Sequence, residues 1–319
     1  MKKSNFKWLK LASSLLIGAS FTQAYAGVSD GSYEVIENGA GKFSIDLSSD
    51  DGVMVPLEGV TQINIDDILF DYDVVLDAPE GGKQDQYRKY RPGKPIYGNI
   101  EVSVCGSRNP VVDAWKTGQG KNIRKNVQII LRKRDGGEGR QYNLFDVFPI
   151  SFSKSDSSGV TCETTVAKIG RVELASSSDN AGNVLDSGVY PLLTGTDVMD
   201  PPFSSWSGGE PAISQQLSTG SDQFHTTTPG HKSVGEITLR GPLTSGRKAM
   251  VDWMNSSVSG KSWRMMLTVK EIVKDGASGK KYNYLDCFPT RYVFPKFSSR
   301  NTGNLYEEVR IKPIRLELR

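Results

Sequence analysis

The chain contains the same sequence pattern twice. YNLFDVFPISFS begins at Tyr142, and YNYLDCFPTRYVF begins at Tyr282, 140 positions later. Five of the first eight residues are identical, and the other three pairs are apolar in both stretches. A chain of 319 residues is long enough for two ordinary domains. Similar patterns at a fixed spacing indicate repeated structural units, so the sequence predicts two copies of one fold.

The repeat extends to both sides of these stretches. YRPGKPIYGNIEV from Tyr90 corresponds to TTPGHKSVGEITL from Thr227, and KIGRVELA from Lys168 corresponds to KPIRLELR from Lys312. The offset therefore rises from 137 to 144, as expected when loops differ in length. The predicted organisation is a signal peptide at 1–26, a first module at 27–174, a linker at 175–188 and a second module at 189–319.

Each copy has the pattern of antiparallel strands with one short helix. Ile100, Val102 and Val104 alternate with polar residues, which is typical of a strand with one buried face. A helix is expected next, starting at Pro110 in the first copy and capped by Thr244 or Ser245 in the second. The predicted fold class is therefore mainly β, with two tandem antiparallel β-sandwich or barrel modules, each with one short flanking α-helix.

A glycine-rich turn, DGGEG or DGASG, precedes each Tyr-Asn stretch and predicts a β-hairpin. The stretch itself is then the return strand, in which Pro149 and Pro289 mark either the strand end or an irregular edge. Large apolar side chains at matching positions are expected to form the structural core. They are Trp115, Trp253, Tyr142, Tyr282, Phe148 and Phe288.

Three cysteines leave one without a partner if a disulfide forms. Cys105 and Cys162 both lie in the first half, so they are the pair predicted to bond in an oxidising compartment. Cys287 stands where the first copy has Val147, which favours a small buried apolar group. Three scattered cysteines and only two histidines do not form a zinc-binding pattern.

The first 26 residues have the features of a secretory signal. A basic start, the short apolar run LASSLLIGASF and the small residues Ala24 and Ala26 match its three regions. The alternative is an amphipathic N-terminal helix. Removal of this segment takes away four lysines, so the net charge falls from +3 to −1. We therefore expect a periplasmic or extracellular protein with no later membrane span and no general affinity for nucleic acid.

Two long polar segments end at the same Pro-Gly pair of the repeat. They span 77–92 and 200–229. Loops of this length are usually functional or bound to a partner. These two are therefore predicted to be functional or bound to a partner, with a flexible surface loop as the alternative.

The sequence does not contain a recognisable set of reactive residues. His225 and His231 are the only imidazoles, and both lie in or beside the second long segment. The stretch NSSVSGKS at 255–262 lacks the first glycine of a phosphate-binding loop. The aspartates of NIDDILFDYDVVLD lack the spacing of a calcium loop. We therefore predict no enzymatic activity, no cofactor, no metal and no catalytic residue.

The ordered elements of each copy resemble the tail tube protein family of contractile-tailed phages. These elements are PG followed by G-x-I, a helix with Trp, a strand, a D-G turn and an aromatic strand ending in Phe148-Pro149 or Phe288-Pro289. The resemblance covers about 90–174 and 227–318. It implies a β-sandwich or barrel with a flanking helix, hexameric rings that stack into a hollow tube, and no catalytic residues. It also implies that a long loop of each subunit reaches the neighbouring ring, and by position 77–92 and 200–229 would be these arms. Type VI secretion tubes share this design.

The chain departs from that family in two ways, because it holds two copies and begins with an export signal. Three chains would then form a pseudo-sixfold ring; alternatively, one chain would contribute to two rings. The leading hypothesis is a structural subunit of a ring, tube or filament. The alternative is a secreted binding module, an adhesin or carbohydrate binder, that uses Trp206 and Tyr87 to stack on sugars. A third hypothesis is an enzyme with a site near His225 and His231.

Overall fold

Antiparallel strands make up most of the chain in the computed structural model, which confirms the predicted mainly β fold. The described residues are 35–49, 51–75, 87–106, 110–117, 123–157, 159–176, 188–193, 203–219, 225–260, 264–272 and 278–318. All of them belong to one unit, Tyr33–Arg319. The predicted signal segment lies outside the described residues, as does the linker between Ser176 and Gly188.

The first half contributes eleven strands and one helix among the described residues. They are β1 (Glu37–Asn38), β2 (Phe43–Ser48), β3 (Met54–Pro56), β4 (Val60–Ile65), β5 (Ile68–Val75), β6 (Lys89–Ile96), β7 (Asn99–Cys105), α1 (Pro110–Thr117), β8 (Lys125–Arg132), β9 (Glu138–Ser157), β10 (Val160–Lys168) and β11 (Arg171–Ser176). One sheet contains the strands β4-β7-β10-β9-β8-β2-β3 in this order, and β11 also pairs with β9.

The second half contributes the remaining strands and a second helix. They are β12 (Gly188–Leu193), β13 (Ser205–Gly208), β14 (Pro211–Thr219), β15 (His225–Val234), β16 (Ile237–Pro242), α2 (Lys248–Val258), β17 (Met265–Ile272), β18 (Ser278–Val293), β19 (Phe297–Ser298), β20 (Gly303–Asn304), β21 (Tyr306–Lys312) and β22 (Arg315–Leu318). Its sheet has the order β12-β17-β18-β21-β16-β13, and β22 also pairs with β18.

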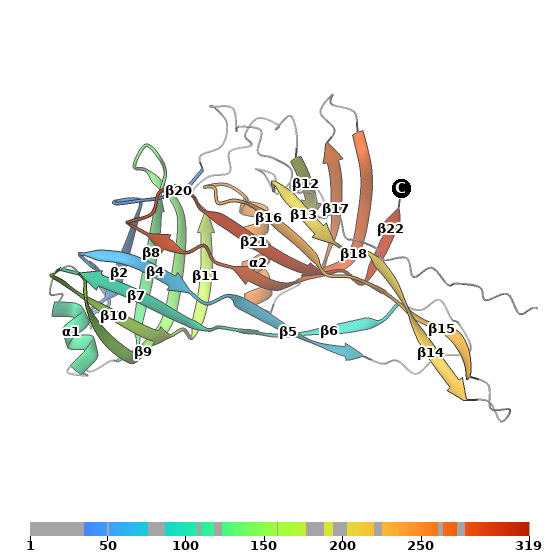
Figure 1. Cartoon of the computed structure of the whole chain (residues 1–319), viewed down its shortest axis with the longest axis horizontal. Helices are drawn as coiled ribbons and strands as arrows, with labels where there is room; N and C mark the ends of the chain where they lie inside the picture. The colour runs from blue at the N-terminus through green and yellow to red at the C-terminus, as the bar shows by residue number, and fades with distance from the viewer. Residues whose placement is uncertain are drawn as a thin grey trace, which may run out of the picture. The chain divides into compact units, whose positions relative to one another are not determined.

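The two halves have the same strand order. Read from one edge, β4-β7-β10-β9-β8-β2 corresponds strand for strand to β13-β16-β21-β18-β17-β12, and β11 corresponds to β22 (Figure 1). The hydrogen bonds repeat as well. The Lys168 Nζ donates to the Tyr97 carbonyl at 2.6 Å, and the Lys312 Nζ donates to the Val234 carbonyl at 2.7 Å. The repeated sequence therefore folds into the same topology twice.

The Tyr142 and Tyr282 stretches lie in the long strands β9 and β18, which continue past Pro149 and Pro289. The irregular-edge reading of the two prolines is the one that the structure supports, because a register shift lies beside each. The repeated aspartates, Asp146 and Asp286, have φ values of 53° and 52°. Aspartate tolerates this left-handed conformation better than most residues, which accounts for its presence in both copies.

Each half carries one short helix, as predicted. α1 begins at Pro110, and α2 begins at Lys248. The prediction that Thr244 or Ser245 caps the second helix is wrong. The cap position is Arg247, which has a left-handed backbone with φ 62° and makes no side-chain capping bond. Its guanidinium group lies instead in a buried polar network, described below, that the sequence pattern does not reveal.

The described part of the second long segment is largely β-structure, so its interpretation as a loop without structure is wrong. Of the first long segment only 87–92 are described, and Lys89 to Pro92 of it belong to β6. β5 and β6 form one hairpin, and β14 and β15 form the other. Each hairpin has a register shift at the matching place, between Phe70 and Tyr72 and between Ile213 and Gln215. The two hairpins touch where Tyr87 bridges to Lys232 (Figure 1). Residues 76–86, 194–202 and 220–224 lie outside the described part.

The apolar core runs through both halves. Alternate residues of β7, such as Ile100, Val102 and Val104, are buried, and so are Ile237 and Leu239 of β16. One cluster of buried side chains includes residues from the first and the second half. Within the described ranges, neither helix is long and apolar enough to cross a membrane.

Candidate functional site

The two halves are joined by strands that pair across the boundary between them. β5 of the first half extends the second sheet by pairing with β18, with Ile68 opposite Tyr292 and Leu69 opposite Arg291. In return, β19 of the second half extends the first sheet by pairing with β4, with Phe297 opposite Ile63. The first sheet thus ends on a strand of the second half, and the second sheet carries a branch, β5 and β6, from the first half. We call this contact the central junction.

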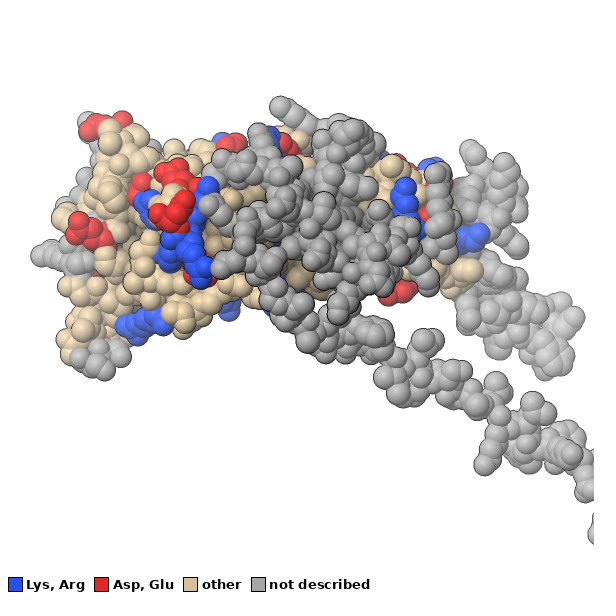
Figure 2. Space-filling view, turned by 90° about the horizontal axis from the view of Figure 1, so that it is seen from above, with Lys and Arg blue, Asp and Glu red and all other residues tan. Residues whose placement is uncertain are grey.

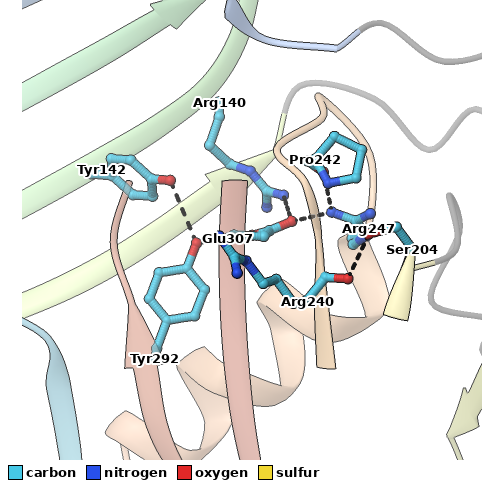
Figure 3. A network of polar contacts seen from close by, with 8 residues as sticks. All are labelled: Arg140, Tyr142, Ser204, Arg240, Pro242, Arg247, Tyr292 and Glu307. Atoms are coloured by element: carbon cyan, nitrogen blue, oxygen red, sulfur yellow. Dashed lines mark hydrogen bonds and ion pairs between the residues drawn. The ribbon is translucent and has the colours of Figure 1, made fainter. Parts of the chain in front are cut away.

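A buried polar network lies at the centre of the central junction (Figure 3). Glu307 of β21 accepts from the Arg140 guanidinium of β9 at 3.3 Å and also binds the Arg247 guanidinium. The second oxygen of Glu307 accepts a hydrogen bond from the Tyr292 hydroxyl at 3.0 Å. The Tyr142 and Tyr292 hydroxyls lie 3.4 Å apart, which extends the network back into the first half.

The network holds two positive groups and one negative group without access to water. The side chains of Arg140, Arg247 and Glu307 all have an exposed fraction of 0%. Burial raises the pKa of the Tyr142 and Tyr292 hydroxyls, so both stay protonated and serve as donors. Arg140 Nε and Nη1 have no hydrogen-bond partner among the described residues. Charges buried in this way depend strongly on their partner across the junction.

Aromatic rings surround the network and come from both halves. The Tyr142 and Phe294 rings meet edge to face at 5.1 Å, and the Tyr292 and Phe294 rings do so at 4.9 Å. Phe297 packs against Phe43 at 6.1 Å. Edge-to-face pairs of this kind add about 0.5–1.5 kcal/mol each beyond the area that they bury. The central junction therefore has the character of a packed core.

A second aromatic cluster lies where the β5–β6 hairpin covers the second sheet. Phe288 is fully buried there by Tyr72 and Tyr90, whose rings lie 5.6 Å apart. At the rim, the Arg291 Nε donates to the Asp67 carboxylate at 2.7 Å. A groove of about 300 Å³ opens beside this ion pair between the hairpin and the second sheet.

The predicted core residues do not all reach the same depth. Trp115, Trp253, Tyr142 and Phe288 are buried. Tyr282 and Phe148 are half-buried, so the expectation that they belong to the interior is too strong. Tyr282 packs on Trp206, with ring centroids 5.2 Å apart, and the Arg124 guanidinium lies over Phe148 at 4.9 Å. Both of these contacts come from the half to which the ring itself belongs.

Cys105 and Cys162 lie opposite each other on β7 and β10 and form a disulfide. Cys287 is a buried free thiol at the position of the equally buried Val147. Burial raises the pKa of the Cys287 thiol, so the thiol is neutral and has the apolar role that its position suggests.

The structure does not bring the two histidines into a reactive constellation among the described residues. His225 begins β15, and His231 lies six positions further along the same strand. Within the described ranges, no group of three His, Cys, Asp or Glu side chains is placed to hold a metal ion. On the face drawn in Figure 2, basic and acidic side chains lie next to one another and do not form a field of one sign.

Sequence reasoning missed Arg140, Arg247 and Glu307. Arg140 lies next to a glycine-rich turn, where a basic residue ordinarily faces solvent, and Glu307 belongs to an alternating strand. The repeat carried a usable signal, because a basic residue follows the turn in both copies, Arg140 in the first and Lys280 in the second.

Residues 198–317 match the family model of the T4-like virus tail tube protein gp19. The match covers most of the second half, and it confirms the resemblance to phage tail tube proteins predicted from the sequence. No curated protein matches the chain.

Several solved structures align with less than half of the chain. One is the sheath-tube complex of an extracellular contractile injection system, PVC, in its extended state, with 20% identity over 43% of this chain and 91% of that one, at a TM-score of 0.37. Another is the tube-terminating cap of the anti-feeding prophage, with 17% identity over 45% and 95%, at 0.37. A third is Hcp1 from Flavobacterium johnsoniae, with 16% identity over 41% and 93%, at 0.26.

Proposed function

We propose that the chain is a structural subunit that assembles into rings, which stack into a hollow tube. The observation that carries the proposal is the central junction. The second half, whose sequence matches a tail tube family, pairs there through its strands with the first half, which has the same strand order. In this proposal the two halves arose by internal duplication, so that three chains supply the six modules of one ring.

The contact between the halves is of the kind that builds rings. The first half uses β4 and β5 at the central junction, whereas the second half uses β18 and β19. These surfaces differ, so the contact is heterologous. Each half still has an unused surface that corresponds to the one its partner uses, and this surface can bind a further neighbour. A heterologous contact repeated around an axis gives a closed ring when the rotation closes. Closure would also cover the strand edges that an isolated chain leaves open.

The remaining features fit a secreted structural protein. The long segments 77–92 and 200–229, which the β5–β6 and β14–β15 hairpins include in part, are proposed to carry the contacts between stacked rings. The proposed role needs no catalytic residue and no cofactor, and the segment 1–26 is proposed to direct export to the periplasm or the exterior.

The alternative function, a sugar-binding module, loses its main support. Trp206 is half-buried in β13 and packs against Tyr282 and Tyr284, so it does not present an open ring face. Tyr87 packs against the core and pairs with Lys232 through the backbone. Both aromatic residues take part in internal packing.

The test is electron microscopy of negatively stained chain lacking 1–26, together with its mass in solution. The expected result is rings or tubes in which three chains complete one turn. A monomer that persists at high protein concentration would overturn the proposal. Rings of six chains would keep the structural role and reject the pseudo-sixfold arrangement.

A further inference from the structure

We infer that a second copy of this chain docks its first half on β13 and β14 of the second half, and that its β9 pairs with β14 as β18 pairs with β5 inside the chain. The inference rests on the proposed ring and names the surfaces that close it. It is drawn from the central junction, which serves as a template for the contact between chains.

Strand registers identify the corresponding residues. In β9, Ser151 lies opposite Val166 directly after a register shift, and in β18, Arg291 lies opposite Arg310 directly after the same kind of shift. Ser151 therefore corresponds to Arg291, and Phe152 corresponds to Tyr292. On the hairpins, Leu69 faces Ile96 and Ala212 faces Ser233, 137 positions later than Ile96. Ala212 therefore corresponds to Leu69.

The template contact then predicts one particular pairing between chains. Inside the chain, Leu69 lies opposite Arg291 and Ile68 lies opposite Tyr292. Between chains, Ala212 of one copy is expected opposite Ser151 of the next, and Pro211 opposite Phe152. Both members of the first pair, Ser151 and Ala212, are exposed in the isolated chain. Their strands can therefore meet a partner without any internal rearrangement.

Corresponding residues differ in burial in the way that a missing neighbour would cause. Tyr142 and Tyr292 are fully buried at the central junction, whereas Tyr282 is half-buried and Phe152 is 41% exposed. Phe288 is fully buried under the β5–β6 hairpin, whereas Phe148 is half-buried. In each pair, the more buried residue is covered by the other half of the same chain. The less buried residue lies where only a half of another chain could cover it.

Four of the ten exposed large apolar side chains among the described residues lie on the same two surfaces. Ile150 and Phe152 of β9 and Val160 of β10 are more than one-third exposed on the first half, and Ile213 of β14 is 58% exposed on the second. Isolated apolar residues are normal on a surface, but a group on a strand with an open edge marks an interaction site. Contact between the two surfaces would bury both groups at once.

The charges of the template are also repeated. Glu163 faces Val104 across β10 and β7, and Glu307 faces Gly241 across β21 and β16, so the two glutamates correspond. Glu307 binds Arg140 across the central junction, and the residue at the position of Arg140 in the second half is Lys280. The first half thus carries an acidic residue, and the second half a basic residue, at the places where the template has an ion pair. Inside the chain Glu163 also pairs with Lys116 and Lys154.

Cysteine cross-linking tests the pairing directly. Chain carrying Ser151→Cys is mixed with chain carrying Ala212→Cys, the mixture is disassembled and reassembled, and mild oxidant is added. The expected product is a covalent dimer containing one chain of each variant. The double variant Leu69→Cys with Arg291→Cys is the positive control, because it should cross-link within one chain. Asp135→Cys, in the exposed β8–β9 turn, replaces Ser151→Cys in the negative control.

The readouts separate this inference from the proposed function. If rings form but Ser151→Cys and Ala212→Cys do not cross-link, the proposed strand pairing is wrong and the proposed ring still stands. The same holds if two Ser151→Cys chains cross-link to each other. Chains that stay monomeric while the internal control cross-links would overturn both.

A surface variant gives a second measurement. Phe152→Glu should abolish ring formation while the chain still unfolds in one cooperative transition, because Phe152 is 41% exposed and the Lys116 ammonium that lies over its ring, 5.7 Å from the centroid, can also face a carboxylate. Val53→Glu is the matched control, since Val53 is 63% exposed near β3. Normal rings from Phe152→Glu would also contradict the inference.

Discussion

Arg140 and Glu307 lie 167 positions apart in the chain, yet their side chains form a fully buried ion pair with a nitrogen–oxygen distance of 3.3 Å. Glu307 also binds Arg247, so one carboxylate holds two guanidinium groups. Removal of one member of a buried charged group typically costs about 3–5 kcal/mol, because the remaining charges lose their partner. Loss of this carboxylate should therefore weaken the association of the two halves.

Glu307→Gln should lower the free energy of unfolding by about 3–5 kcal/mol, since two like charges would stay buried without an anion. Urea denaturation measures this loss. The matched control is Glu163→Gln at the corresponding position of the first half, where the carboxylate pairs with Lys116 and Lys154 and is itself 29% exposed. That change should cost about 1 kcal/mol or less. Equal losses in the two variants would show that the buried network does not hold the halves together.

The left-handed aspartates give a second prediction. Asp286→Ala should destabilise the chain by about 1–2 kcal/mol, because a residue with a Cβ and no short polar side chain is strained at φ 52°. Asp286→Gly should recover much of this loss, because glycine adopts positive φ without a steric penalty. Asp156→Ala, at an exposed position of β9, is the control and should be nearly neutral. An equally large loss from Asp286→Gly would mean that the side chain matters more than the backbone.

Acid should remove a contribution from Glu163. Hydrogen bonds from Lys116 and Lys154 lower the pKa of the Glu163 carboxyl to about 2, against roughly 4.3 in an unfolded chain. A lowered folded pKa means that the stabilisation is complete above about pH 4.3 and is lost as the pH falls towards 2. Because the site is partly open to solvent, we expect about 1 kcal/mol or less.

The measurement is the unfolding free energy of the parent chain and of Glu163→Gln between pH 7 and pH 2, in dilute protein. The difference between them should be constant down to about pH 5 and shrink below it. A difference that grows on acidification would contradict the assignment of the lowered pKa.

Much of the fold follows from the repeat, because local patterns determine it. The alternation around Ile100 and Ile237, the proline at the start of α1 and the glycine-rich hairpin turns all indicate elements that the structure contains. The resemblance to tail tube proteins followed from the order of these elements and not from any single motif.

The central junction could not be predicted in the same way. β5 could pair with β18 of the same chain or with the corresponding strand of a neighbouring chain. The repeat makes these partner strands similar in sequence, so the sequence does not distinguish the two arrangements. Arg247 illustrates the same limit. Its position favours a neighbouring cap such as Thr244, but Glu307 lies close in space and draws the guanidinium inward. Contacts between distant segments decide such positions, and spacing along the chain does not encode them.

The exchange of strands at the central junction predicts that the two halves unfold together. Ile63 of the first half pairs with Phe297 of the second, and Tyr292 of the second pairs with Ile68 of the first, so neither sheet is complete alone. Trp253→Ala should cost about 3–5 kcal/mol, because this ring is almost fully buried. Trp115→Ala should act on the same single transition, although Trp115 lies in the other half.

Tryptophan fluorescence and circular dichroism should therefore give coincident urea curves for the parent and for both variants, with the midpoint shifted and the slope unchanged. Trp206→Phe is a suitable control, since it keeps an aromatic ring on Tyr282 at the edge of the second sheet. Two separate transitions, with each tryptophan variant moving only one of them, would mean that the halves are independent domains. The central junction would then be too weak to serve as the template for a ring.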